Sequence, residues 1–195
     1  DAETGQHTRR TSAYVHAIAK ELVREGKFTE LLTDAYVEDM TIAASLHDIG
    51  KICISDTILN KPGRLTDEEF EKMKEHTSAG RKILQDISAN LGETEYQKIA
   101  MDLAGYHHEW GDGTRGYPER LKGEEIPLSA RIMAIADVFD ALITVRPYKR
   151  AFTIEEAVEI IHKESGTHFQ PEIVEAFDRV LPELLKISER YAEAA

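Results

Sequence analysis

The hydrophobic positions along this chain recur with the period of an α-helix almost throughout, and the alternating pattern of a strand is nearly absent. The first such segment covers about residues 3–25, where Val15, Ile18 and Leu22 fall on one apolar side. Gly26 follows it, and glycine is the residue that most often ends a helix. The pattern therefore predicts a long amphipathic helix at the start of the chain.

The next segments combine helical periods with turn signals. A helix is expected over residues 34–47, and the glycines and the proline of residues 49–64 predict a connecting loop. Thr66 and Glu69 have the spacing of a capping box, which starts a helix that reaches His76. A separate helix is expected to continue beyond it.

The most apolar segment lies in the second half of the chain. Residues 96–107 predict a helix that places His107 on its apolar face, and residues 109–127 predict a loop. Residues 129–144 are apolar on most of their positions, so we expect this helix to be the most buried.

The last third of the chain contains two further helices. Thr153 and Glu156 form a second capping box, and the helix that they open ends before Gly166. Pro171 starts the last helix, which Pro182 is expected to break or kink. The sequence therefore predicts a single all-α domain.

Composition and charge restrict the classes of function. The 195 residues are 42% hydrophobic with a formal net charge of −12, which suits a domain in water and excludes a sequence-independent grip on a nucleic acid polymer. Cys53 is the only cysteine, which indicates a reducing, cytoplasmic location, and no apolar run is long enough for membrane insertion. The chain begins at Asp1 without a methionine, so residues 1–195 are expected to be a domain excised from a longer protein.

The segment SLHDIGK places His47 beside Asp48 where a helix is expected to meet a loop. An imidazole nitrogen and a carboxylate oxygen can bind one divalent ion together, and the two oxygens of Asp48 could bridge two ions. Lys51 could contact a phosphate or protonate a leaving oxygen. Taken alone, the pair fits a structural role in shaping the helix end equally well.

Several other histidines and acidic residues have the spacing or the setting of metal ligands. Glu3 and His7 are four positions apart, so they share a helix face. Asp137 lies in the most apolar helix, where an unpaired charge is costly and a bound metal would satisfy it. The remaining candidates are His76, His107 and His108.

The candidate ligands form a mixed set of nitrogen and oxygen donors without a thiolate cluster. Such a set suits iron, manganese, cobalt, nickel or zinc in a reactive site rather than a structural zinc. More than four candidates indicate at least two ions. Because two neighbouring ions clamp a phosphoryl group and activate water, the set predicts hydrolysis of a phosphate ester.

A basic loop, VRPYKR, follows the Asp137 helix. Arg146 offers a planar guanidinium to a phosphate, and Lys149 offers a point charge. On its own such a loop is as readily a solvated surface, but in a chain this acidic the grouped cations favour substrate binding.

Six motifs follow one another along the chain: ETGQHTRR, HDIGK, KPGRLTDEEFEKMKEHTSAGRKIL, HHE…DG…GYP, IPLSARIMAIADVFDAL and RPYKRA. In this order of motifs the chain resembles the HD-GYP domain, a subgroup of the HD phosphohydrolase superfamily. The resemblance covers nearly the whole chain. It implies an all-α fold, a single compact helical bundle with an extended GYP subdomain. It also implies metal-dependent hydrolysis of the bacterial second messenger cyclic di-GMP to pGpG, GMP or both.

The resemblance implies a role for each candidate residue. Asp48 matches the bridging carboxylate, and Lys51 matches a lysine near the scissile phosphate, both of them catalytic. Arg146 and Lys149 match contacts to the substrate phosphates, and Tyr117 of the GYP loop is a further substrate contact. The implied metal ligands are Glu3, His7, His47, Asp48, His76, His107, His108 and Asp137.

The resemblance also implies cofactors and partners. Two or three divalent ions are expected, with iron and manganese the metals that the family suggests, and Glu3 matches a glutamate associated with the third ion. The implied partners are cyclic di-GMP and, through the GYP loop, a diguanylate cyclase or another protein. Monomer and homodimer stay open. The domain is expected to follow a sensory or receiver domain in a longer signalling protein.

The loop after the paired histidines departs from the usual family form, HHExWDGxGYP. Trp110 follows Glu109 directly, and two residues, Thr114 and Arg115, separate the glycines where one is usual. We expect this difference in the loop to affect guanine recognition, loop mobility and partner docking more than metal binding. Gln170 also stands where an aspartate is commoner.

Two other functions fit the same residues. The chain could be a catalytically weak sensor or docking module that binds the dinucleotide or a partner protein without turnover. It could also be an HD phosphohydrolase that acts on another nucleotide. Measured turnover and a panel of substrates separate these alternatives from hydrolysis of cyclic di-GMP.

Overall fold

The computed structural model describes the backbone of residues 2–146 and 148–193 and the side chains of residues 4–146 and 148–192. Helices dominate this part of the chain and it contains no strand, so the all-α prediction is confirmed. The helices, with η for short 3₁₀ turns, are α1 (Ala2–Arg24), α2 (Asp34–Ala43), η1 (Ala44–Leu46), η2 (Ile49–Cys53), α3 (Asp56–Leu59), α4 (Asp67–Leu91), α5 (Glu95–Tyr106), η3 (Gly123–Glu125), α6 (Leu128–Ile143), α7 (Ile154–Lys163) and α8 (Pro171–Glu193).

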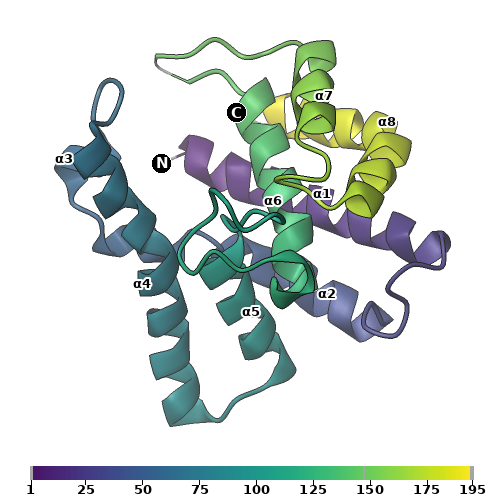
Figure 1. The fold of residues 1–195 in the computed structure, drawn as a ribbon, viewed down its shortest axis with the longest axis horizontal. Helices are drawn as coiled ribbons and strands as arrows, with labels where there is room; N and C mark the ends of the chain where they lie inside the picture. Colours follow the sequence, from purple (N-terminus) through teal and green to yellow (C-terminus); the bar gives the residue numbers. More distant parts are fainter. Residues whose placement is uncertain (1, 147, 194–195) are drawn as a thin grey trace.

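Helix α1 runs through the middle of the molecule and contacts α2, α6 and α8 (Figure 1). Its predicted apolar residues Val15, Ile18 and Leu22 are fully buried. Gly26 follows the helix with a φ of 74°, a left-handed conformation that glycine adopts without strain. The first helix of the chain is thus the one around which the others pack.

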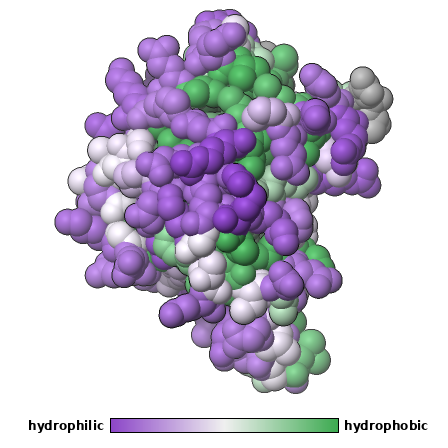
Figure 2. Space-filling model, turned by 90° about the vertical axis from the view of Figure 1, so that its right-hand side faces the viewer, coloured by the Kyte–Doolittle hydropathy of each residue, from purple (hydrophilic) through white to green (hydrophobic). Residues whose placement is uncertain are grey.

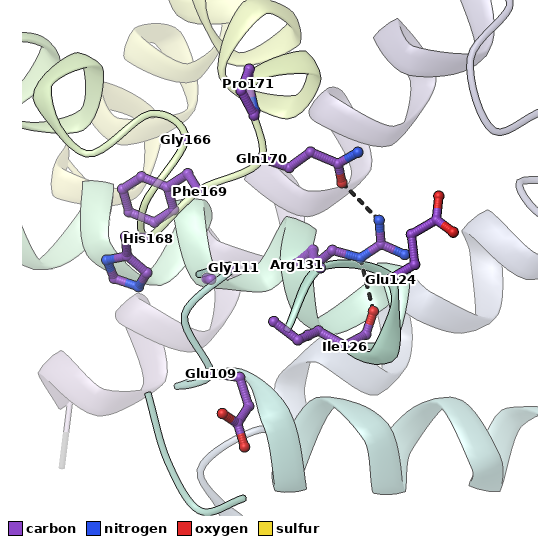
Figure 3. Close-up of a pocket in the computed structure, with 12 residues that line it drawn as sticks. Glu109, Gly111, Glu124, Ile126, Arg131, Gly166, His168, Phe169, Gln170 and Pro171 are labelled. Atoms are coloured by element: carbon purple, nitrogen blue, oxygen red, sulfur yellow. Dashed lines mark hydrogen bonds between the residues drawn. The ribbon is translucent and has the colours of Figure 1, made fainter. Parts of the chain in front are cut away.

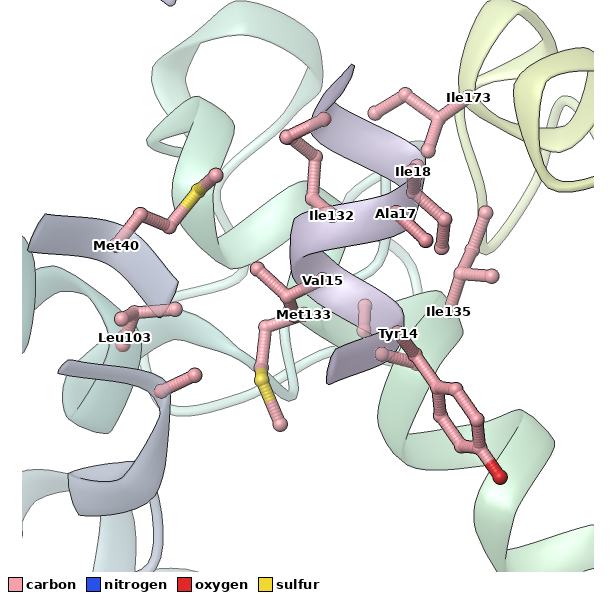
Figure 4. Packing of buried hydrophobic residues seen from close by; sticks show 14 of the residues in the cluster. Tyr14, Val15, Ala17, Ile18, Met40, Leu103, Ile132, Met133, Ile135 and Ile173 are labelled. Atoms are coloured by element: carbon pink, nitrogen blue, oxygen red, sulfur yellow. The ribbon is translucent and has the colours of Figure 1, made fainter. Parts of the chain in front are cut away.

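The hydrophobic core lies mainly between α1 and α6. Helix α6 is buried along most of its length, as the apolar run predicts. Figure 4 shows this packing, with residues of α2 and α5 completing it on one side and a residue of α8 on the other. The labelled core residues are Tyr14, Val15, Ala17, Ile18, Met40, Leu103, Ile132, Met133, Ile135 and Ile173.

Helices α4 and α5 form a hairpin that projects from this core (Figure 1). Helix α5 contacts α2 and α6, and α4 contacts η2. Thr66 caps α4 by accepting a hydrogen bond from the backbone N–H of Glu69 at 3.1 Å. The Glu69 carboxylate turns instead to Lys61, whose Nζ lies 2.7 Å away, so the predicted box is half formed. The box at Thr153 is complete.

Several predicted elements differ from the structure. Residues 49–64 are not a plain loop, because they contain η2 and α3, and the loop predicted over residues 109–127 contains η3. The two helices expected around His76 are the single helix α4, in which Gly80 is retained because its backbone packs against Gly50. Helix α8 continues through Pro182, so the predicted break is absent, and the exposed ring costs one helical donor without entering the core.

The face of the molecule in Figure 2 is mostly hydrophilic, with apolar side chains gathered in separate patches. Among the described helices, none combines the length and the apolar character needed to cross a membrane.

Candidate metal centre

The predicted ligands come together where α1, the turn between η1 and η2, α4, the end of α5, and α6 meet. Seven of the eight form three groups, and the ligand atoms within each group lie within 4.8 Å of one another. The eighth, Glu3, has its side chain outside the described residues. The groups are Asp48 with His76, His107 and His108; His7 with His47 and Asp48; and His47 with His107 and Asp137.

Three of the imidazoles are held in one orientation by the backbone of their own turn. In His47, His76 and His107, Nδ1 lies 2.7 Å from the carbonyl oxygen of a residue three or four positions earlier. A carbonyl oxygen only accepts hydrogen bonds, so Nδ1 carries a proton and Nε2 is the nitrogen left to bind a metal. This is the tautomer that a metal ligand needs.

The Nε2 atoms of these histidines are buried and have no hydrogen-bond partner among the described residues. They nevertheless face Asp48, with Nε2 to Oδ1 distances of 3.4 Å for His76 and 3.5 Å for His107. Lone pairs that face a carboxylate oxygen repel it unless a cation lies between them. Because two ligands about 2.1 Å from one ion stand roughly 3.0–3.4 Å apart, the cluster fits a divalent ion.

The close packing of η2 against α4 fixes the position of Asp48 relative to His76. A Cβ atom at Gly50 would lie 1.8 Å from the carbonyl oxygen of His76 and 2.5 Å from the amide nitrogen of Gly80. Both atoms belong to the backbone, so they cannot rotate away. Only glycine therefore allows the two segments of ligands to approach this closely.

His7 is oriented by a carboxylate from another helix. Its Nδ1 lies 2.7 Å from Oδ2 of Asp140, and its Nε2 lies 3.1 Å from Oδ1 of Asp137. Asp140 is buried and accepts hydrogen bonds from the Arg10 guanidinium at 2.7 and 3.0 Å and from the Tyr14 hydroxyl at 3.3 Å. A carboxylate behind a ligating imidazole fixes its tautomer and raises its basicity.

Asp140 and Arg10 support the candidate ligand His7, and the sequence reasoning missed both. Asp140 lies three positions after Asp137 on the most apolar helix, so the cost of a buried charge could have singled it out as well. Arg10 gives no comparable signal, because its partner is 130 positions away in the sequence.

The charges of the cluster shift the pKa values of its members. Burial alone would lower the pKa of His47, but the carboxylates of Asp48 and Asp137 outweigh it and raise the pKa to about 10. Burial would raise the pKa of Asp48, yet His47 and the neighbouring imidazoles hold it well below its usual range. Burial and the adjacent His107 hold the pKa of His108 well below that of a free imidazole. The carboxylates thus stay charged, and a metal ion bound at Nε2 of His47 would displace a proton from that imidazole.

Two predicted substrate residues lie at the edge of this cluster. The Tyr117 ring stacks on His108, with 4.9 Å between centroids and 20° between planes. Burial raises the pKa of Tyr117, so its phenol stays protonated. The Nζ atom of Lys51 lies 3.0 Å from Oδ2 of Asp48, and its side chain is 43% exposed.

The other two predicted substrate residues are not members of the cluster. Arg146 and Lys149 are exposed on the loop after α6, where each backbone N–H donates to the carbonyl oxygen of the other at 3.1 Å. The Lys149 ammonium lies 5.2 Å from the centroid of the Phe152 ring. Their contact with substrate stays a prediction.

The long loop after the paired histidines is organised by Glu109 and Trp110, to which the sequence reasoning gave no structural role. The buried carboxylate of Glu109 accepts hydrogen bonds from the backbone N–H groups of Glu119 and Leu121, at 2.7 and 3.2 Å. The displaced Trp110 stacks on His168 at 4.1 Å with parallel planes, 3° apart. The loop is therefore held at both its beginning and its end.

A cavity of about 180 Å³ lies beside this loop (Figure 3). Arg131 crosses its wall and donates hydrogen bonds to Oε1 of Gln170 at 2.7 Å and to the carbonyl oxygen of Ile126 at 2.8 Å. Gln170, noted as a departure, is thus the partner of Arg131. Among the described residues that line the cavity, none is a predicted ligand, so the cavity is separate from the metal centre.

Comparison with known proteins gives consistent matches. The profile of the HD domain family matches residues 2–173. A protein of Vibrio cholerae named cyclic di-GMP phosphodiesterase is 48% identical over 195 residues, which are 100% of this chain and 39% of the relative. A protein of Thermotoga maritima with the same name is 42% identical over 190 residues, which are 97% of this chain and 48% of the relative. The chain thus spans less than half the length of these relatives.

Solved structures show the same fold at low sequence identity. An HDG"Y"P protein from Bdellovibrio bacteriovorus matches with a TM-score of 0.68 and 20% identity, covering 90% of this chain and 51% of the other. A cyclic GMP-AMP specific phosphodiesterase of V. cholerae matches with a TM-score of 0.59 and 23% identity, covering 95% and 48%. The profile match over residues 2–173 and the relatives at 48% and 42% identity show that the chain belongs to the HD domain family, as its resemblance to the HD-GYP subgroup indicates.

Proposed function

We propose that this chain hydrolyses cyclic di-GMP by means of divalent metal ions held at the cluster. The observation that carries the proposal is the convergence of unpartnered, buried Nε2 atoms on Asp48. Relatives named cyclic di-GMP phosphodiesterase that match nearly the whole chain support the substrate. The adjoining groups that share Asp48 support a centre of at least two ions.

Some residues of the cluster would bind the metal ions, and Lys51 beside them would bind the substrate or transfer a proton. When bound, neighbouring divalent ions stabilise charge on a phosphoryl group and lower the pKa of water. Asp48 is the shared ligand of the two adjoining groups. Lys51, with its ammonium 3.0 Å from Asp48, is placed to meet a phosphoryl oxygen or to protonate the departing sugar oxygen. Arg146 and Lys149 would then bind the second phosphate.

The identity and number of the ions belong to the same proposal. Nitrogen and carboxylate donors without thiolates favour iron or manganese over a structural zinc. Glu3 would supply a ligand to a third ion from the same helix as His7. If Glu3→Ala leaves the metal content unchanged, the third ion is absent and the dinuclear centre remains.

The test is anaerobic purification followed by metal analysis and identification of the products formed from cyclic di-GMP. Asp48→Asn should lower kcat on the order of 10³-fold or more and reduce the bound metal. Asp86→Asn is the matched control, because Asp86 is an exposed carboxylate that pairs only locally with Lys82 at 3.3 Å. Metal-loaded wild-type protein that binds cyclic di-GMP without cleaving it would favour the docking module instead.

A second candidate substrate comes from other relatives. A V. cholerae protein named 3'3'-cGAMP-specific phosphodiesterase 2 is 39% identical over 173 residues, 89% of this chain and 30% of the relative. We therefore include 3'3'-cGAMP in the substrate panel, ranked by kcat/KM. A preference for 3'3'-cGAMP would replace cyclic di-GMP as the substrate without changing the metal chemistry.

Other expectations stay proposals of the same kind. A partner protein at the GYP loop, a homodimer, a preceding sensory or receiver domain and a cytoplasmic location are each consistent with a signalling enzyme. Pull-down with a diguanylate cyclase, with and without the loop residues 110–118, would test the first of them.

A further inference from the structure

An aromatic and cationic assembly extends from the metal centre onto the exposed side of α4. It starts at His108, on which Tyr117 stacks with 4.9 Å between centroids. The Phe70 ring meets Tyr117 edge to face, with 6.3 Å between centroids and 85° between planes. The Lys74 ammonium lies 5.0 Å from the Phe70 centroid and 5.6 Å from the Tyr117 centroid. One ring, Tyr117, thus separates Phe70 from a candidate metal ligand.

Phe70 does not serve the hydrophobic core. Its side chain is 45% exposed, although α4 offers buried positions on its other side. Lys74 lies one helical turn later on the same face, with Glu71 holding its Nζ at 2.7 Å, so the ammonium stays beside the rings. An exposed ring with a cation over it, next to the proposed phosphate-binding centre, has the chemistry of a nucleobase site.

We propose that Phe70 and Lys74 bind one guanine base of the dinucleotide while its phosphate occupies the metal centre. This inference rests on the proposed function. Any nucleobase can stack on an exposed aromatic side chain. A cation beside the stacked base selects guanine, because O6 and N7 of guanine are both hydrogen-bond acceptors. Adenine offers a donor at the position of O6, so the ammonium disfavours it. Phe70 supplies affinity for the base, and Lys74 supplies the preference for guanine.

The chain offers matched controls for both residues on the same helix. Ile87 is also 45% exposed, and Lys82 pairs with Asp86 as Lys74 pairs with Glu71. Phe70→Ala should raise KM for cyclic di-GMP about 10-fold, the loss expected for one stacked base, with kcat within about two-fold. Ile87→Ala should leave both constants unchanged, and Phe70→Trp should restore KM.

Two further measurements separate base binding from a structural effect. For methyl p-nitrophenyl phosphate, which has no nucleobase, Phe70→Ala should change KM less than about two-fold. Lys74→Met should reduce the preference for cyclic di-GMP over cyclic di-AMP about 10-fold, whereas Lys82→Met should not. Equal changes of KM for the base-free diester and the dinucleotide, or an unchanged KM in Phe70→Ala, would overturn the assignment.

The dissociation constant of metal-loaded protein for cyclic di-GMP gives a test that does not depend on turnover. If the wild type binds without cleaving, the proposed hydrolysis fails while the base site is still measured. In that case Phe70→Ala should weaken binding about 10-fold relative to both the wild type and Ile87→Ala. Equal dissociation constants for all three proteins would remove Phe70 from the binding site.

Discussion

The two sides of the metal centre are built in different ways. On one side, His47, His76 and His107 are each oriented by a carbonyl oxygen of their own turn. On the other side, His7 is oriented by Asp140, which lies 133 positions later in the sequence. A local turn forms whenever its helix forms, whereas the contact between His7 and Asp140 requires α1 and α6 to dock. We expect the first side to tolerate changes in the core that the second does not.

Asp48 and His47 join the two sides. Asp48 belongs to the group of His7 and to the group of His76, and His47 belongs to the group of His7 and to a group with His107. The position of Asp48 is set by the contact of η2 with α4 at Gly50. Asp48 therefore differs from His7, which a distant carboxylate orients, and from the histidines that their own turns orient. A change at that contact should therefore affect both sides, and a change at Asp140 should affect one.

The largest effect is expected from Gly50→Ala. The added methyl group would overlap the carbonyl oxygen of His76, so η2 must move away from α4 and take Asp48 with it. We expect both metal sites to lose most of their metal and the free energy of unfolding to fall by about 3 kcal/mol. Metal analysis and denaturant unfolding of the purified variant measure the two effects.

Gly5→Ala is the control for this change, because it also adds a methyl group to a glycine but meets no atom within 4 Å. This variant lies on α1 near His7 and should keep its metal. Wild-type metal content in Gly50→Ala would show that the approach of the two backbones does not set the geometry of Asp48.

A smaller and one-sided effect is expected from Asp140→Asn. The amide keeps the size of the side chain but removes the charge that faces His7 and Arg10. Loss of the carboxylate behind a ligating histidine should weaken metal binding at the His7 group 10- to 100-fold. The group of His76 and His107 should change by less than about three-fold, so titration of metal-free protein should separate into two steps.

The control for Asp140→Asn is Asp178→Asn, which removes a carboxylate paired with an exposed histidine, His162, at 2.7 Å. It should leave both binding steps unchanged. Equal weakening of the two steps in Asp140→Asn would mean that the sides are coupled through Asp48 more strongly than their separate supports suggest.

The helices could be predicted from the sequence where the local hydrophobic period and the local capping residues determine them. The apolar side of α1 and the buried run of α6 follow from spacing alone. The continuity of helix α4 could not be predicted in this way, because a glycine such as Gly80 lowers the intrinsic stability of a helix. The reason for a glycine at this position, its close contact with Gly50, is visible only in the structure. Contacts between segments far apart in the sequence override such local signals.

The metal centre shows the same limit. The candidate ligands could be named from the sequence, because the order of the motifs resembles a known family, and the structure brings seven of the eight together. Their supports could not, since the carboxylate behind His7 comes from a helix that periodicity alone does not place beside α1. The partner of Trp110 was hidden for the same reason: His168 lies 58 positions later, between α7 and α8.

The smallest effect is expected at that loop, outside the cluster. Trp110→Leu removes the stack on His168 and should lower the free energy of unfolding by about 1 kcal/mol. The metal content should stay unchanged, because Tyr117 holds the His108 ring and Glu109 binds the loop backbone independently of Trp110. His168→Leu should cost more, because it also removes the contact with Glu164 at 3.0 Å and the stack on Phe169. The double variant should cost less than the sum if the Trp110 and His168 rings stabilise each other. Additive losses would show that Trp110 and His168 pack separately, and loss of metal in either variant would show that the loop and the metal centre are one unit.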